Sequence, residues 1–148
     1  MRVVSAALVL SLAACGGDSS TGPDGSDSSL SMDVDGVTWH PDIVTAQRSS
    51  GVASVAAVET ATAIGFSFGV PDSGSGTYTV GEIDVVVTYN NATEGWTASQ
   101  VHGGSGTVTV TTLTSDRFAG TFSGVLPAQS GQMPATVTIT NGTFDISF

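Results

Sequence analysis

The chain has 148 residues, a formal net charge of −10 and a sequence pI near 4.1. It has no lysine, and Arg2, Arg48 and Arg117 are its only cationic side chains besides histidine, against 13 carboxylates. Nucleic acids and anionic lipid headgroups bind clustered Lys and Arg side chains, so this composition argues against both as partners. The length is sufficient for one domain with a hydrophobic core.

Residues 1–14 have the pattern of a secretory signal peptide. Arg2 supplies one positive charge, and the apolar and small residues 3–14 end directly before Cys15, the only cysteine. This run is shorter than the roughly 20 residues that a membrane-spanning helix needs. The pattern therefore predicts a cleaved leader rather than a permanent transmembrane anchor.

The sequence Leu12-Ala13-Ala14-Cys15 resembles the lipobox of bacterial lipoproteins. The resemblance implies that Cys15 is diacylated, becomes the mature N-terminus and holds the protein to the membrane through its acyl chains. Gly16 follows in place of the aspartate that retains such proteins at the inner membrane, which implies the outer membrane in a cell that has one. The alternatives are an ordinary secretory peptide cut after Ala14, or an unprocessed N-terminus with a chance cysteine.

Residues 15–31 are rich in Gly, Ser and Asp and have almost nothing to bury, so we expect a flexible linker. From 32 to 148, short runs of Val, Thr, Ile and Phe alternate with polar residues and are broken by Gly, Asn, Asp or Pro about every 8 to 12 residues. This pattern predicts one all-β domain, an antiparallel β-sandwich or a partly open β-barrel of about 8–10 strands.

The first strand pair can be predicted in detail. Asp35-Gly36 favours a two-residue type I′ turn. That turn pairs Val34 with Val37, and Met32 with Trp39, which places Trp39 in the core.

Four further strand-like runs follow, at residues 52–60, 61–68, 77–80 and 83–89. The second run places Ile64, Phe66 and Phe68 on one face. In the last run the residues expected on one face are Ile83, Val85, Val87 and Tyr89.

Phe118, Phe122 and Leu126 alternate with Gly120 and Gly124 on one face of a later strand. Glycine weakens a strand unless a bend, a bulge or a close neighbour needs the space. We therefore expect this strand to curve around the core.

The apolar phase of the C-terminal segment shifts by one residue at Asn141-Gly142. A hairpin that pairs Ile139 with Phe144 explains the shift, and so does one long strand with a bulge. We favour the hairpin, and in both cases the C-terminus belongs to the core.

The domain also resembles uncharacterised β-rich lipoproteins of the bacterial envelope. The shared motifs are Asp-Gly-x-x-Trp at 35–39, Gly-x-Tyr at 76–78, Gly-Thr-Val-Thr-Val at 106–110, Gly-Thr-Phe at 120–122 and Thr-Asn-Gly-Thr-Phe at 140–144. These are turn glycines and core aromatics, so the resemblance implies a β fold and no activity.

The sequence contains no recognisable catalytic motif. The two histidines are isolated, and no Gly-x-Ser-x-Gly elbow is present. We therefore predict a protein that is not an enzyme and needs no cofactor or metal. An alternative enzyme that uses carboxylates or a metal would need at least two of His40, Asp42, His102 and Glu94 in one cleft.

The leading hypothesis is a lipid-anchored envelope protein that acts as a binding or structural module, with an unknown envelope protein or glycan as partner. Trp96 follows a polar segment, so it is a candidate ligand-binding residue together with Tyr89 and His102. For Trp96 we nevertheless favour a structural role, packed over the end of the sandwich. A second functional hypothesis is a small barrel with an apolar ligand inside, in the space left by small residues such as Ala56, Gly120 and Gly124.

Overall fold

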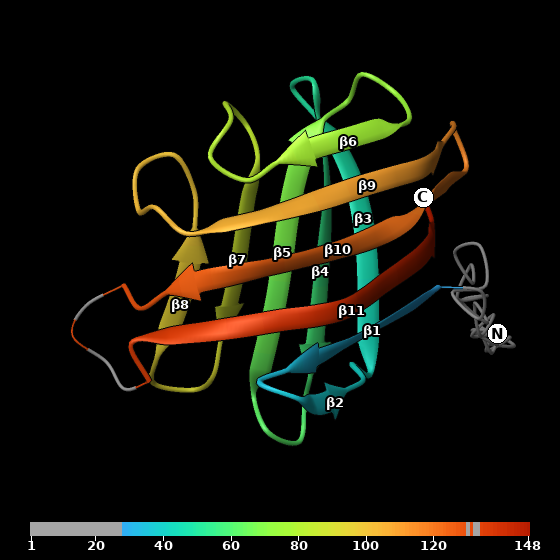
Figure 1. The fold of residues 1–148 in the computed structure, drawn as a ribbon. Coiled ribbons are helices and arrows are strands. Elements are labelled where there is room, and N and C mark those ends of the chain that lie inside the picture. The colour runs from blue at the N-terminus through green and yellow to red at the C-terminus, as the bar shows by residue number, and fades with distance from the viewer. Residues whose placement is uncertain (1–27, 130, 132–133) are drawn as a thin grey trace, which may run out of the picture.

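The computed structural model describes residues 28–129, 131 and 134–148, which form a two-layer β-sandwich (Figure 1). The predicted signal peptide, Cys15 and most of the predicted linker lie outside the described residues. Within the described part all strand pairs between elements are antiparallel, and no residue is helical. No described helix is therefore available to span a membrane.

One layer is a six-stranded sheet with the order β2-β1-β11-β10-β9-β6. Its strands are β1 (Ser29–Val34), β2 (Val37–Trp39), β6 (Gly76–Thr79), β9 (Ser105–Leu113), β10 (Arg117–Pro127) and β11 (Thr136–Ser147). The other layer is a five-stranded sheet with the order β3-β4-β5-β7-β8. Its strands are β3 (Ile43–Ser49), β4 (Val52–Glu59), β5 (Ile64–Pro71), β7 (Val86–Asn90) and β8 (Gly95–Ala98).

The sheets do not close on each other, so the predicted all-β class is confirmed as a sandwich rather than a barrel. The strands of the two layers cross at a steep angle in Figure 1. The described chain has 11 strands, slightly more than the 8–10 expected.

Phenylalanines from both layers fill the space between the sheets. Phe66 stacks on Phe122 with ring centroids 4.8 Å apart, and Phe68 meets Phe144 edge-on at 5.0 Å. Gly120 leaves no void, because a Cβ there would lie 2.1 Å from the Thr109 carbonyl oxygen and 2.9 Å from Phe144. The interior that an apolar ligand would need is therefore occupied by side chains.

Two of the small residues assigned to that interior lie instead against close neighbours, and the third faces outward. Gly120 and Gly124 adjoin register shifts in the pairing of β10, as expected for glycines that make room for a neighbouring strand. Ala56 is exposed, because it alternates with the inward Val55 and Ala57. The prediction that Ala56 lines the interior is wrong.

The first strand pair forms as predicted. Val34 pairs with Val37 and Met32 with Trp39, around a turn in which Asp35 and Gly36 have φ angles of 49° and 82°. Positive φ at both positions is the requirement of a type I′ turn.

The first strand also begins earlier than the expected domain start at Met32. β1 starts at Ser29, and its Leu30 pairs with Phe144 and is buried in the core. The apolar–polar alternation therefore extends into the end of the segment that the composition predicts as linker.

The C-terminal segment is one continuous strand, so the favoured hairpin is wrong and the bulge is right. Along β11 the register on β1 moves from Ser31–Thr143 to Asp33–Thr140, which leaves one extra residue in β11. Asn141 takes a φ of 52° there. Strand β11 is central, with β1 on one side and β10 on the other, so its two halves cannot pair with each other.

The prediction that alternate residues of 83–89 share one buried face is confirmed only in part. Val85, Val87 and Tyr89 are buried, but Ile83 is 72% exposed. Asp84, between Ile83 and the strand, has a φ of 68°, so a turn interrupts the alternation before β7 begins.

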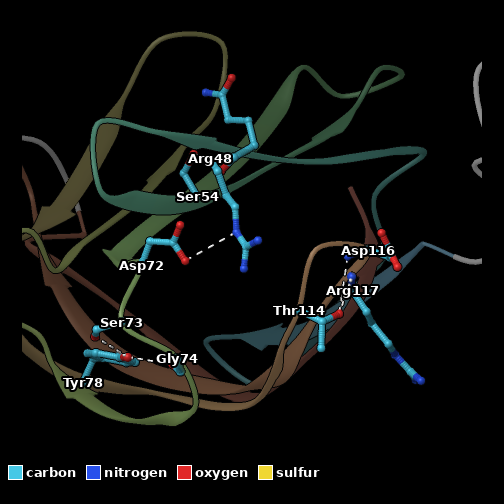
Figure 2. Close-up of polar contacts among 10 residues, drawn as sticks. Arg48, Ser54, Asp72, Ser73, Gly74, Tyr78, Thr114, Asp116 and Arg117 are labelled. Carbon is cyan, nitrogen blue, oxygen red and sulfur yellow. Dashed lines mark hydrogen bonds and ion pairs between the residues drawn. The ribbon is translucent and has the colours of Figure 1, made fainter.

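The loop between β5 and β6 is held from both sides (Figure 2). Arg48 Nε lies 3.4 Å from Asp72 Oδ1, and the Tyr78 hydroxyl donates a 2.7 Å hydrogen bond to the Gly74 carbonyl. The Arg48 guanidinium also lies 4.6 Å from the centroid of the Phe148 ring. These contacts close the end of the sandwich where the chain terminates.

Candidate functional site

A cavity of about 430 Å³ lies where the β1–β2 turn approaches the turn between β4 and β5. We call it the Trp39 cleft. Its lining residues are Val34, Val37, Thr38, Trp39, His40, Glu59, Ile64 and Tyr89. Aliphatic, aromatic and ionisable side chains thus share one concave surface, as in most small-molecule sites.

The local folding of three strands brings the polar groups of the cleft together. Trp39 ends β2, Glu59 ends β4 on the inward-facing phase of that strand, and Tyr89 lies in β7. Trp39 donates its Nε1–H to Glu59 Oε2 across 3.1 Å. The Thr62 hydroxyl donates to the same oxygen at 2.5 Å. The Glu59 carboxylate is therefore held through one oxygen, while Oε1 has no hydrogen bond to the described residues.

Tyr89 supplies a donor in the same cleft. Its ring is buried, and its hydroxyl makes no hydrogen bond with another described residue. Burial raises the pKa of the phenol above its ordinary value of 10.0, and the negative charges of Asp35 and Glu59 raise it further. The Tyr89 hydroxyl is therefore protonated at neutral pH and can donate to a ligand.

An acidic side chain lies on the outer face of β1, beside the strand that carries Thr38 and Trp39. Hydrogen bonds from the Asn141 amide and the Thr38 hydroxyl lower the pKa of Asp33 below 3.8. Asp33 is therefore ionised at neutral pH, on the strand next to Thr38 and Trp39. Inside the cleft, the Glu59 carboxylate beside aromatic walls favours a ligand that brings positive charge or hydrogen-bond donors.

Trp96 is not exposed at a loop edge. It is 2% exposed, and its Nε1–H donates a 2.8 Å hydrogen bond to the Pro134 carbonyl. Its ring packs against Tyr89 with centroids 5.8 Å apart. The favoured packing role of Trp96 is confirmed, because the residue occupies an inward position of β8 opposite Tyr89. Trp96 supports the wall behind Tyr89 and offers no face to a sugar ring.

His102 lies in a different place, on the loop between β8 and β9. Its Nδ1 is 3.1 Å from the Ser99 hydroxyl, whose oxygen also accepts the His102 backbone N–H. This pair borders a second cavity of about 440 Å³, lined by Glu82, Ile83, Asp84, Val86, Thr97, Ser99, Gln100, Val101 and His102. No hydrogen bond or ion pair joins His102 to a carboxylate among the described residues.

The four residues considered for an enzyme do not share a cavity. His40 lines the Trp39 cleft and His102 lines the second cavity, while Asp42 and Glu94 line neither. Asp42 accepts hydrogen bonds from Thr60 instead, which lower its pKa. In residues 28–129, 131 and 134–148, no three His, Cys, Asp or Glu side chains are placed to hold a metal ion.

Both sheets of the sandwich lie in a region that matches a known protein family. Residues 26–145 match a family described as a domain of unknown function, DUF6252. The chain belongs to the DUF6252 family. The matched region of this DUF6252 domain begins before β1 and ends within β11, so it covers both sheets. No curated protein matches the chain.

Sequence reasoning placed Tyr89 among the candidate ligand residues of this DUF6252 domain but missed its partners in the cleft. Trp39 was expected only in the core, and Glu59 was not among the candidate site residues. A signal was present in the Asp-Gly-x-x-Trp motif, which puts a tryptophan at the open end of a tight turn. Nothing in the sequence indicates that Glu59 lies beside it.

Proposed function

We propose that this protein is a lipid-anchored envelope module that binds a small ligand in the Trp39 cleft. The observation that supports it is the Glu59 carboxylate, held by Trp39 and Thr62 beside the Tyr89 hydroxyl, which has no hydrogen-bond partner among the described residues. A carboxylate with one uncommitted oxygen, next to aromatic and aliphatic walls, suits a ligand with a cationic or donor head and an apolar body.

The anchor is part of the proposal. It rests on the lipobox resemblance of Leu12-Ala13-Ala14-Cys15 and on Gly16, which favours the outer membrane. Two or three acyl chains on Cys15 hold a protein stably at a membrane, since each buried methylene contributes about 0.8 kcal/mol.

The path of β1 is consistent with an anchored binding module. The backbone N–H of Ser147 donates a 3.2 Å hydrogen bond to the Ser28 hydroxyl, so the first described residue lies beside the end of β11. Strand β1 then runs six residues, about 20 Å, before it reaches the cleft at Val34. The chain therefore enters the domain at the end remote from the cleft, which leaves the cleft open to a ligand.

Intact mass spectrometry of the membrane-extracted protein tests the anchor. We expect a mass equal to the chain from Cys15 plus acyl groups, and we expect the Cys15→Ala variant to lose both the acyl mass and the membrane fraction. An unmodified protein in the soluble fraction would refute the anchored part of the proposal.

Titration of the full chain with benzylamine, and with benzyl alcohol as a neutral analogue of similar shape, tests the cleft. The readout is the NMR shift of the two indole N–H signals, assigned with Trp39→Phe and Trp96→Phe. We expect benzylamine to move the Trp39 signal at lower concentration than benzyl alcohol does.

The matched variants are Glu59→Gln and Glu94→Gln, which remove the same charge in the cleft and in the β7–β8 turn. Glu59→Gln should abolish the preference for the amine, whereas Glu94→Gln should retain it. Equal effects of both variants, or no shift of the Trp39 signal, would contradict ligand binding at this site.

A further inference from the structure

The outer face of the five-stranded sheet has no charged side chain over β3, β4, β5 and β7. Pairing and burial alternate along these strands, and the outward positions are Ile43, Thr45, Gln47, Ser49, Val52, Ser54, Ala56, Val58, Gly65, Ser67, Gly69, Val86, Thr88 and Asn90. The only charged residues of these strands, Arg48 and Glu59, occupy the inward phase near strand ends. This is unusual on a chain with a net charge of −10. We call this surface the uncharged face.

Exposed aliphatic side chains form two small groups on the same surface, with Ile43 and Val58 paired at one end of the sheet and Val86 at the other. Ile43 is 51% exposed, and Val58 and Val86 are also exposed on the uncharged face. Ile83 and Val101 lie at its edge, where they line a cavity together with Val86. Grouped exposed aliphatics of this kind mark an interaction surface more often than singly scattered ones do.

The uncharged face is also hollowed. One cavity of about 350 Å³ and another of about 260 Å³ both include Ala56 and Ser67 in their lining, so they form one trough along β4 and β5. On the far side, Gln129 covers β8 by donating from Nε2 to the Thr97 hydroxyl at 2.6 Å. The open part of the face therefore extends from β3 to β7.

We propose that two copies of this chain associate through their uncharged faces. Identical copies carry the same net charge and repel each other wherever their carboxylates meet. The outer surface of the six-stranded sheet carries the charged side chain of Asp33 and the ion pair of Arg117 with Asp145. At the uncharged face, in contrast, aliphatic side chains of one copy meet small uncharged side chains of the other, so a two-fold arrangement is self-complementary.

The area of the uncharged face is smaller than the area that a stable dimer interface buries. Four strands about 4.8 Å apart and about seven residues long cover about 450 Å² per copy. A stable interface buries about 800 Å² per partner. The association is therefore reversible and weaker than that of an obligate dimer.

Sedimentation velocity of the full chain in detergent, over a range of protein concentrations, tests the proposal. Ala56→Glu places one carboxylate per copy in the centre of the uncharged face, and Thr121→Glu places the same charge on exposed β10 of the opposite sheet. We expect Ala56→Glu to raise the dimer dissociation constant at least tenfold and Thr121→Glu to change it less than twofold. Raising the salt from about 10 mM to about 150 mM should strengthen the wild-type dimer, because salt screens the mutual repulsion.

A second pair of variants keeps the proposal testable if Ala56→Glu does not fold. Ala56→Cys and Thr121→Cys are treated with a short bis-maleimide, and only Ala56→Cys should yield dimer above the wild-type background. A wild-type chain that stays monomeric, or equal behaviour of the two sites in either pair, would overturn the proposal. A monomer that binds an apolar dye in an Ala56-dependent way would assign the face to an apolar ligand instead.

Discussion

Trp39 and Glu59 join the two sheets of the sandwich through one hydrogen bond of 3.1 Å. Trp39 belongs to β2 in the six-stranded sheet, and Glu59 belongs to β4 in the five-stranded sheet. Both lie at the open end of the core, where strands end and packing is incomplete. The bond therefore contributes to stability and at the same time orients the carboxylate of the proposed ligand site.

We predict that Glu59→Ala lowers the free energy of unfolding by about 1–2 kcal/mol, because the partly buried Trp39 N–H loses its acceptor. Glu59→Gln should cost less, since its amide oxygen can still accept this bond. Urea unfolding of the wild type and both variants measures the difference. Equal losses in the two variants would indicate that the charge, rather than the hydrogen bond, stabilises the fold.

Gly120→Ala should be one of the most destabilising small substitutions in the chain. The added Cβ would lie 2.1 Å from the Thr109 carbonyl oxygen, which belongs to the neighbouring strand and cannot rotate away. We expect a loss of about 3 kcal/mol from this overpacking. Gly76→Ala is the control, because its Cβ would have nothing nearer than 4.0 Å, and its thermal midpoint should stay close to that of the wild type.

Removal of residues 145–148 should destabilise the domain by at least about 4 kcal/mol, or prevent folding. Ile146 is fully buried, and Phe148 stacks on Phe118 with ring centroids 5.9 Å apart. The single variants separate the two contributions: Ile146→Ala should cost more than Phe148→Ala, because Phe148 is only partly buried. An unchanged melting temperature in the truncated chain would refute a structural role for the C-terminus.

The Arg117–Asp145 pair should give a small, pH-dependent contribution to stability. Hydrogen bonding from Arg117 lowers the pKa of Asp145 below its ordinary value of 3.8. The stabilisation is therefore present above pH 3.8 and is lost as the pH falls through the lowered pKa of the folded state. The Asp145 side chain is 42% exposed, so we expect less than about 1 kcal/mol at neutral pH.

Asp145→Asn tests this prediction through unfolding measured across the pH range. The variant should be slightly less stable than the wild type at neutral pH and equally stable at strongly acidic pH. Added salt should reduce the neutral-pH difference as well. A difference that persists at low pH would mean that the amide disturbs packing rather than removing an ion pair.

The sequence alone was sufficient for the features that depend on near neighbours in the chain. Alternation with a period of two specifies strands and their buried faces, as in Phe66 and Phe68. The Asp35-Gly36 turn specifies the register of β1 and β2, because only a tight turn with positive φ joins those residues. The absence of charged residues from the outward positions of β3, β4, β5 and β7 is also a property of the sequence.

Tertiary structure decided the features that depend on which strands become neighbours. At Asn141-Gly142, a turn and a bulge shift the apolar phase equally. The bulge forms because Leu30, which is far away in the chain, pairs with Phe144. Long-range pairing likewise buried Trp96 and brought Glu59 to Trp39. Local patterns set the direction of each side chain, but only the packing of the two sheets determines which side chains meet.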